Sequence, residues 1–136
     1  QDIRFQQLPH WQAKLALGYF NQLNHEIDHR RQIAKIYSQK INHDLISTKL
    51  ISQINHATNL RFPIFTNHRQ DLINYLKHHG VYISDTWYDT PISPVDLCPH
   101  SEKISRTIVN LPTHRHVSVA AAKLISHDIN QWHQSL

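Results

Sequence analysis

Two histidines and a glutamate at helical spacing are the first residues of this sequence that could do chemistry. They stand in the segment HEIDH, where His25 and His29 are four residues apart and Glu26 follows the first histidine. On a helix, a pair at this spacing lies on one face and could hold a zinc ion while the glutamate activates water. Histidine makes up 13 of the 136 residues, however, so this spelling arises readily by chance. A zinc-dependent hydrolase is therefore one alternative for the function.

The surroundings of HEIDH favour an ordinary helix surface. In the helical phase set by Leu23 and Ile27, both histidines fall beside the apolar stripe, and Arg30 and Arg31 follow directly. Two positive charges would repel a cation bound next to them. We therefore expect these histidines on a solvated helix face and predict no metal site.

Other residues of catalytic type do not form a complete site. Cys98 and His100 could supply two metal ligands, but no second pair stands at the spacing of a zinc finger. The sequence has only two glycines, Gly18 and Gly80, so it contains no glycine-rich loop that would hold a phosphate. We assign no catalytic residue within this chain.

Length and composition bound the class of protein. The chain has the size of one domain, and its 40% hydrophobic content can build one modest core. No apolar run approaches the roughly 18 residues that cross a bilayer, and no signal pattern is present, so we expect a cytoplasmic protein that does not enter membranes. The formal net charge is +4, but the basic residues are scattered, and we expect no nucleic-acid partner. Methionine is absent and the chain begins at Gln1, so we expect a processed product or a piece of a larger protein.

The pattern of apolar residues predicts three regions within a single domain, residues 1–136. Residues 1–43 carry apolar side chains at helical spacing and form a linking region of one long helix or two abutting helices. Residues 44–58 form a connector, and residues 59–136 form a small α/β subdomain. The first region is too long and too apolar for the core of this subdomain alone, which indicates a missing partner.

Within the subdomain the sequence predicts three strands separated by helices. The strands are residues 60–66, 81–88 and 107–113, which combine alternating or apolar runs with β-branched and aromatic residues. Short helices lie between them, and Ser118 is placed to cap a final helix. The fold class is therefore α/β, or more closely α+β: a long N-terminal helix followed by a small, roughly three-stranded sheet packed by helices.

Several blocks of the chain resemble one enzyme family. Residues 12–37, QAKLALGYFNQLNHEIDHRRQIAKIY, are similar to the segment that follows the lysine-bearing domain in the DegT/DnrJ/EryC1/StrS family of pyridoxal-phosphate (PLP) sugar aminotransferases. Later blocks follow in the family's order: LRFPI at 60–64, WYDTPISP at 87–94, and SEKISRTIVNLPTH at 101–114. The resemblance covers nearly the whole chain, and VNLPTH is its most specific part.

The resemblance implies the small C-terminal domain of a fold-type-I aminotransferase, which is normally a homodimer. Such an enzyme transfers an amino group from a donor such as glutamate to a nucleotide-linked keto-sugar, and a lysine holds its PLP as a Schiff base. The family places that lysine in the large domain, which precedes the region matched here. We therefore expect this chain to be inactive alone, to bind no PLP by itself, and to lack the catalytic large domain.

Two candidate sites follow from the resemblance. Family members carry an N-x-R-M run whose asparagine reaches the cofactor phosphate, and here Asp2 replaces the asparagine while Arg4 is retained as a candidate cofactor-binding residue. Members also carry Y-x-x-P-x-H in the substrate-facing loop, where this chain has Tyr88 and, in place of the histidine, Ser93. We predict that Trp87, Tyr88 and Ser93 form an edge of the substrate pocket.

Alternatives to the fragment interpretation stay open at this point. One is a stand-alone binding or regulatory module that derives from this domain, and the other is the zinc hydrolase. Without a large domain the apolar helix face would be uncovered, so we expect the chain to self-associate through Leu15, Tyr19, Phe20 or Leu23.

Overall fold

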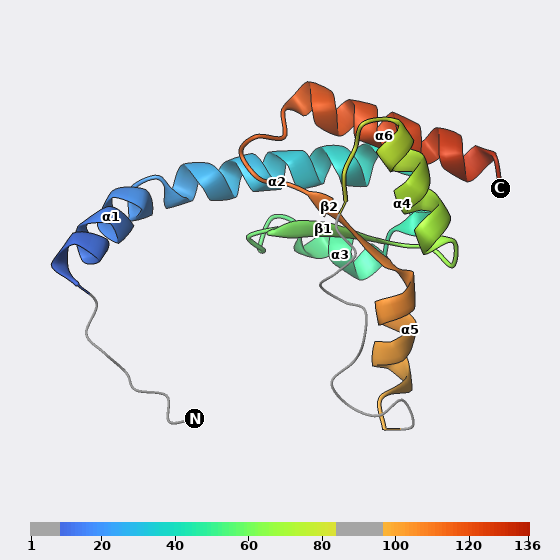
Figure 1. Cartoon of the computed structure of the whole chain (residues 1–136), viewed down its shortest axis with the longest axis horizontal. Coiled ribbons are helices and arrows are strands. Elements are labelled where there is room, and N and C mark those ends of the chain that lie inside the picture. Colours follow the sequence, from blue (N-terminus) through green and yellow to red (C-terminus); the bar gives the residue numbers. More distant parts are fainter. Residues whose placement is uncertain (1–8, 84–96) are drawn as a thin grey trace.

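Two consecutive helices begin the described part of the chain. A computed structural model describes residues 9–83 and 97–136. Helix α1 spans His10–Phe20 and helix α2 spans Leu23–Lys40. Between them the amide of Gln22 donates to the carbonyl of Tyr19, 3.0 Å away, which tightens the last turn of α1. The helices form an arm whose α1 end extends away from the other elements (Figure 1), so the predicted helical region consists of two abutting helices.

The remaining elements fold around the second half of this arm. Their order along the chain is η1 His43–Leu45, α3 Thr48–Gln53, β1 Arg61–Phe65, α4 Arg69–His78, α5 Pro99–Thr107, β2 Ile108–Pro112 and α6 Val119–Gln134. The described part is a mostly helical α+β fold with six α-helices and a two-stranded sheet. None of its helices combines the length and apolar character that a membrane span needs.

The sheet pairs β1 with β2 in antiparallel register. Phe62 lies opposite Leu111 and Ile64 lies opposite Val109, and all four side chains are buried. Helices α2 and α4 each contact the sheet, and α6 packs against both helices (Figure 1). The apolar side chains of both strands therefore join those of the helices in one core.

The prediction of a three-stranded sheet is wrong for the residues that the structure describes. Residues 81–83, the start of the predicted second strand, are not in a strand, and the rest of that segment lies outside the described residues. The amide of Val81 donates to the carbonyl of Leu76 at 2.9 Å, and the amide of Gly80 donates to Lys77 at 3.1 Å. These bonds form the Schellman cap of α4, with Gly80 in the left-handed region at a φ of 78°. The Val81 amide therefore serves the end of a helix rather than a strand ladder.

Tyr37 joins α2 to the sheet from within the core. Its side chain is fully buried, and its ring lies 5.5 Å from the ring of Phe62 between centroids. The phenol donates a hydrogen bond of 3.0 Å to the carbonyl of Pro112, at the end of β2. Burial raises the pKa of Tyr37, so the phenol stays protonated and donates this hydrogen bond well above neutral pH.

Candidate functional site

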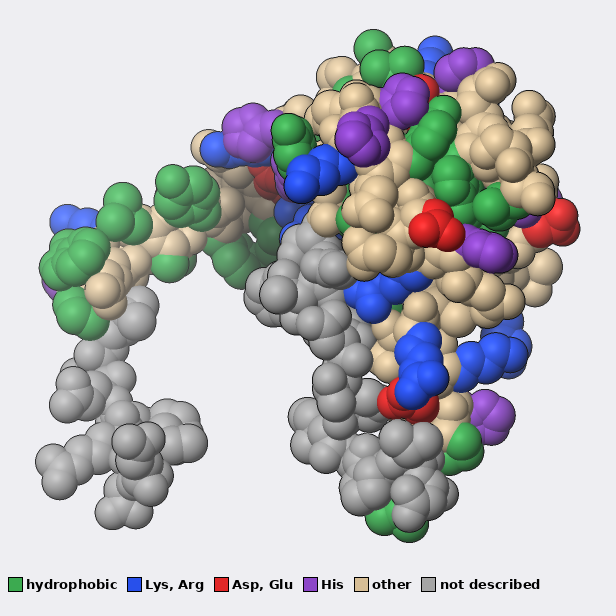
Figure 2. Space-filling model, turned by 45° about the vertical axis from the view of Figure 1, so that its right-hand side comes forward, with side chains coloured by type: hydrophobic (Ala, Val, Ile, Leu, Met, Phe, Trp, Pro, Cys, Tyr) green, Lys and Arg blue, Asp and Glu red, His purple; other side chains and the backbone are tan. Residues whose placement is uncertain are grey.

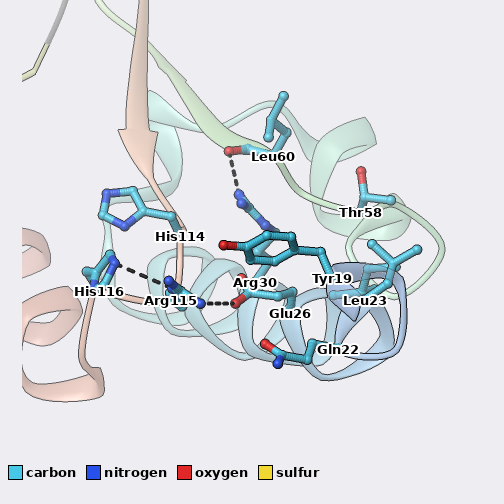
Figure 3. A pocket seen from close by; sticks show the side chains of 11 residues that line it. Tyr19, Gln22, Leu23, Glu26, Arg30, Thr58, Leu60, His114, Arg115 and His116 are labelled. Carbon is cyan, nitrogen blue, oxygen red and sulfur yellow. Dashed lines mark hydrogen bonds and ion pairs between the residues drawn. The ribbon is translucent and has the colours of Figure 1, made fainter. Parts of the chain in front are cut away.

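A hollow lies where α1 and α2 meet the end of the sheet at which β1 begins and β2 ends. Its volume is about 590 Å³, within the range of small-molecule sites. Three regions of the chain line it: the α1–α2 junction, the segment before β1, and the loop after β2 (Figure 3). The lining residues are Tyr19, Gln22, Leu23, Glu26, Ile27, Arg30, Thr58, Leu60, His114, Arg115 and His116.

A buried hydroxyl holds two of these regions together. Thr113, directly after β2, has no exposed surface, and its Oγ1 lies 2.6 Å from the carbonyl of Asn59 and 3.0 Å from the carbonyl of Leu60. Arg30 donates from one Nη1 to the Leu60 carbonyl at 3.2 Å and to Thr113 Oγ1 at 3.4 Å. Because these groups come from α2, from the segment before β1 and from the end of β2, the network fixes the relative position of the walls of the hollow.

Asn59 allows the chain to enter β1 at this point. It adopts a φ of 50°, in the left-handed region that asparagine tolerates better than most residues. Its side-chain amide donates to the carbonyls of Ile54 and Ala57 at 2.8 and 3.1 Å. Local hydrogen bonds therefore stabilise the bend that presents the Asn59 and Leu60 carbonyls to Thr113.

The HEIDH segment contacts the loop after β2, which forms the third wall of the hollow. His29 donates from Nε2 to the carbonyl of Val117 at 3.1 Å, while the Val117 amide donates to the His114 carbonyl at 2.8 Å and closes a turn. Glu26 lies 3.8 Å from the guanidinium of Arg115 in the same turn. The expectation of a solvated face holds for the exposed His25 and is wrong for His29, which is half-buried and helps to position the loop after β2.

Zinc chemistry finds no support in the part of the chain that the structure describes. No group of three or more His, Cys, Asp or Glu side chains there could hold a metal ion. His25 and His29 belong to different environments, since only His29 reaches the turn after β2.

Positive charge dominates the hollow. Two guanidinium groups, Arg30 and Arg115, face a single carboxylate, Glu26, and two imidazoles, His114 and His116, lie beside them. The closest of these ion pairs, Arg115 with Glu26, is longer than a direct hydrogen bond, and the Arg115 side chain is 54% exposed. The charge of Arg115 is therefore accessible to a bound group.

The surroundings of His114 lower the pKa of its imidazole. Partial burial is the main reason that its pKa lies below the ordinary value, because desolvation disfavours the charged ring. Nearby positive groups lower it further, in the order His116, Arg61, Arg30 and His29. His114 is therefore neutral at physiological pH.

The structure does not describe the residues predicted from the sequence for a site. Arg4, Trp87, Tyr88 and Ser93 all fall outside the described residues. Sequence reasoning did not single out Arg30 or Thr113 for this hollow. The signal was present for Thr113, since it stands in VNLPTH, the most specific block of the resemblance.

A comparison with protein families shows to which family this chain belongs. The model of the DegT/DnrJ/EryC1/StrS aminotransferase family matches residues 6–130. The chain belongs to this family. Its enzymes are PLP-dependent aminotransferases, and the match includes every wall of the hollow. No curated protein sequence matches the chain closely enough to add a relative.

The side chains present do not fit PLP held as a Schiff base. The family's chemistry needs a lysine that reaches the cofactor, but all seven lysines of this chain are exposed and none lines the hollow. They are Lys14, Lys35, Lys40, Lys49, Lys77, Lys103 and Lys123. We therefore derive no catalytic step through PLP from this chain.

Proposed function

We propose that this chain is the C-terminal domain of a PLP-dependent aminotransferase that acts on a nucleotide-linked keto-sugar, and that it does not catalyse amino transfer by itself. The observation that carries the proposal is the family match over residues 6–130 in a chain whose lysines are all exposed. In the complete enzyme the domain closes the active-site cleft opposite the lysine-bearing domain. PLP, the amino donor and the keto-sugar then bind between domains rather than within this one.

The uncovered face of α1 supports a second part of the proposal. No residue of α1 is buried, although the helix carries Trp11, Leu15, Leu17, Tyr19 and Phe20, which are 56–70% exposed. Figure 2 shows these apolar side chains gathered on the projecting arm. Apolar surface on this scale is characteristic of an interface. We assign it to the large domain and to the second subunit of a homodimer.

Residues outside the described part complete the proposed site. Arg4 contacts the cofactor phosphate, and Trp87, Tyr88 and Ser93 form an edge of the sugar pocket. Ser93 stands where many family members have histidine, so it gives this enzyme a different sugar preference. These roles come from the resemblance and can be tested by substitution in the complete enzyme.

The decisive experiment supplies the missing domain in trans. The chain is assayed alone and together with a separately produced lysine-bearing domain, with PLP, glutamate and a nucleotide-linked keto-sugar, and the 2-oxo acid product is measured. We expect no product from the chain alone and product from the mixture. Product formed by the chain alone would refute the proposal that it is inactive by itself, and a mixture that binds but stays inactive would refute the aminotransferase assignment.

A matched pair of variants tests the docking face. Leu15 on α1 and Leu124 on α6 are both 56% exposed, so a change to glutamate adds the same charge at equal exposure. We expect Leu15→Glu to abolish complementation and Leu124→Glu to leave it intact. Equal effects of the two variants would remove α1 as the docking surface.

The alternative of a stand-alone binding module is favoured by one observation, the hollow with its positive rim. A module would bind its ligand with full affinity in the absence of any large domain. Failure of the chain to associate with a lysine-bearing domain, at concentrations well above those of the assay, would favour this alternative over the fragment.

A further inference from the structure

We propose that the hollow between α2 and the loop after β2 binds an organic anion, a carboxylate or phosphate carried on an apolar or aromatic body. This inference depends on the local geometry of the hollow and does not rest on the proposed aminotransferase function.

The rim of the hollow supplies the anion-binding groups. Arg30 and Arg115 approach from opposite walls, one on α2 and the other in the loop after β2 (Figure 3). Arg30 is anchored through Nη1 by the Leu60 carbonyl and Thr113, so its guanidinium is held in place before a ligand arrives. Arg115 is held by two long contacts, the 3.8 Å pair with Glu26 and a 3.4 Å hydrogen bond from its Nε to Nε2 of His116, so it can exchange them for a bidentate contact with a ligand.

The floor of the hollow suits an apolar body rather than a hydrated inorganic ion. Leu23, Ile27 and Leu60 contribute aliphatic surface, and Tyr19 contributes an aromatic ring. In Figure 3 the Tyr19 hydroxyl is turned toward the loop that carries His114 and Arg115. One molecule would fit both parts of the lining if it placed an apolar group against these side chains and an anionic group between the arginines. Most small-molecule sites combine apolar and polar contacts in this way.

Protonation of His114 adds charge to the same rim. A bound anion favours the charged form of His114 and opposes the causes that lower its pKa. The other charged or titratable groups around it are His116, Arg61, Arg30, His29, Glu26 and Arg115. Linkage then requires the anion to bind more tightly as the pH falls below about 6.5, where His114 begins to take up a proton.

Three probes separate the two halves of the site. Phenyl phosphate carries both the ring and the anion, inorganic phosphate carries only the anion, and phenol carries only the ring. Calorimetric titration of the full chain should give saturable binding for phenyl phosphate, at least about tenfold tighter than for either fragment. Equal affinity for phenyl phosphate and inorganic phosphate, or the absence of saturable binding, would overturn the proposal.

Two arginine variants locate the site. Arg115→Gln should weaken phenyl phosphate binding by about tenfold or more, the effect of losing one charge-assisted hydrogen bond. Arg106 is the matched control, since its exposed side chain pairs with Glu102 on α5, away from the hollow. Arg106→Gln should bind like the unchanged chain. An equal loss in both variants would show attraction to overall charge instead of a site.

Two further measurements verify that the variants are folded and locate the bound anion. Both arginines are exposed, so neither substitution should disturb the core, and circular dichroism will verify this. On addition of phenyl phosphate, NMR shifts should concentrate at the amides of Leu23, Leu60 and Arg115. Shifts centred on α5 or α6 would place the anion elsewhere and refute the assignment, independently of any result with the lysine-bearing domain.

Discussion

Removing the Thr113 hydroxyl tests whether one buried network holds the walls of the hollow together. Thr113→Val keeps the shape of the side chain, so the cost comes from hydrogen bonds rather than from a cavity. The Leu60 carbonyl still accepts from Arg30 in the variant. The Asn59 carbonyl, 2.6 Å from the hydroxyl, loses the one hydrogen bond that the described residues give it.

One buried acceptor without a partner costs about 1–3 kcal/mol. We therefore expect Thr113→Val to lower the free energy of unfolding by about 2 kcal/mol, measured by urea denaturation followed by circular dichroism. Thr107→Val is the control, because the Thr107 hydroxyl bonds within α5 to the carbonyl of Lys103 at 2.9 Å and solvent can replace it. We expect the control to change stability by less than about 0.5 kcal/mol.

The difference between these variants decides the interpretation. If Thr113→Val and Thr107→Val destabilise the chain equally, the network does not hold the junction, and the walls of the hollow are positioned by the apolar core alone. The slope of the denaturation curve must stay unchanged for the comparison to be valid.

Three further predictions concern the cap of α4, the charged loop and the exposed helix. Gly80→Ala should destabilise the chain by about 1 kcal/mol in urea denaturation, because φ is 78° although no atom lies within 4 Å of the new methyl group; an unchanged midpoint would refute the cap argument. The folded-state pKa of His114 is lowered, so the unfolded chain binds the proton more readily, and stability should fall as the pH drops below about 6.5 until the folded pKa is passed. His114→Gln should flatten this part of the stability–pH curve, and an unchanged slope would contradict the assignment. The chain should self-associate through α1 in concentration-dependent light scattering, Leu15→Glu should reduce this more than Leu124→Glu, and a strictly monomeric chain would refute it.

Local signals account for the elements that the sequence predicted correctly. The side chain of Ser118 accepts from the Ala121 amide at 3.1 Å, as expected for the cap of the last helix. The segments predicted as the first and third strands are β1 and β2. Each of these features depends on residues that are neighbours in the chain, so pattern and composition suffice to locate them.

The wrong prediction of the second strand shows that a local strand pattern can be overridden by a neighbouring helix cap. Val81 and Tyr82 have the residue types of a strand, yet the Val81 amide donates to Leu76 because Gly80 lets the helix end in a Schellman cap. Two local rules competed for one hydrogen-bond donor, and the helix cap prevailed.

The hollow was harder to foresee, because its walls come from parts of the chain that are far apart. Arg30 and Thr113 are 83 residues apart, and no spacing rule connects them. The spelling of HEIDH could not indicate the role of His29, because that role depends on a carbonyl 88 residues away. The sequence contains these residues, but only the tertiary structure shows that they contact one another.

The arm formed by α1 and α2 shows why an apolar pattern predicts burial without predicting the partner. The same kind of stripe continues through both helices, but in α2 it buries Ile33 and Tyr37 while α1 buries no residue. The difference is tertiary: the second half of α2 contacts β1 and α6, whereas α1 extends beyond them. An apolar stripe indicates that a helix surface will be covered, but the covering partner can belong to another domain or another subunit.

If covering α1 raises the affinity of the hollow for phenyl phosphate, Tyr19 is the physical link, because it belongs to α1 and also lines the hollow. Titration in the presence and absence of the lysine-bearing domain measures this coupling, and equal affinities would show that the two surfaces act independently.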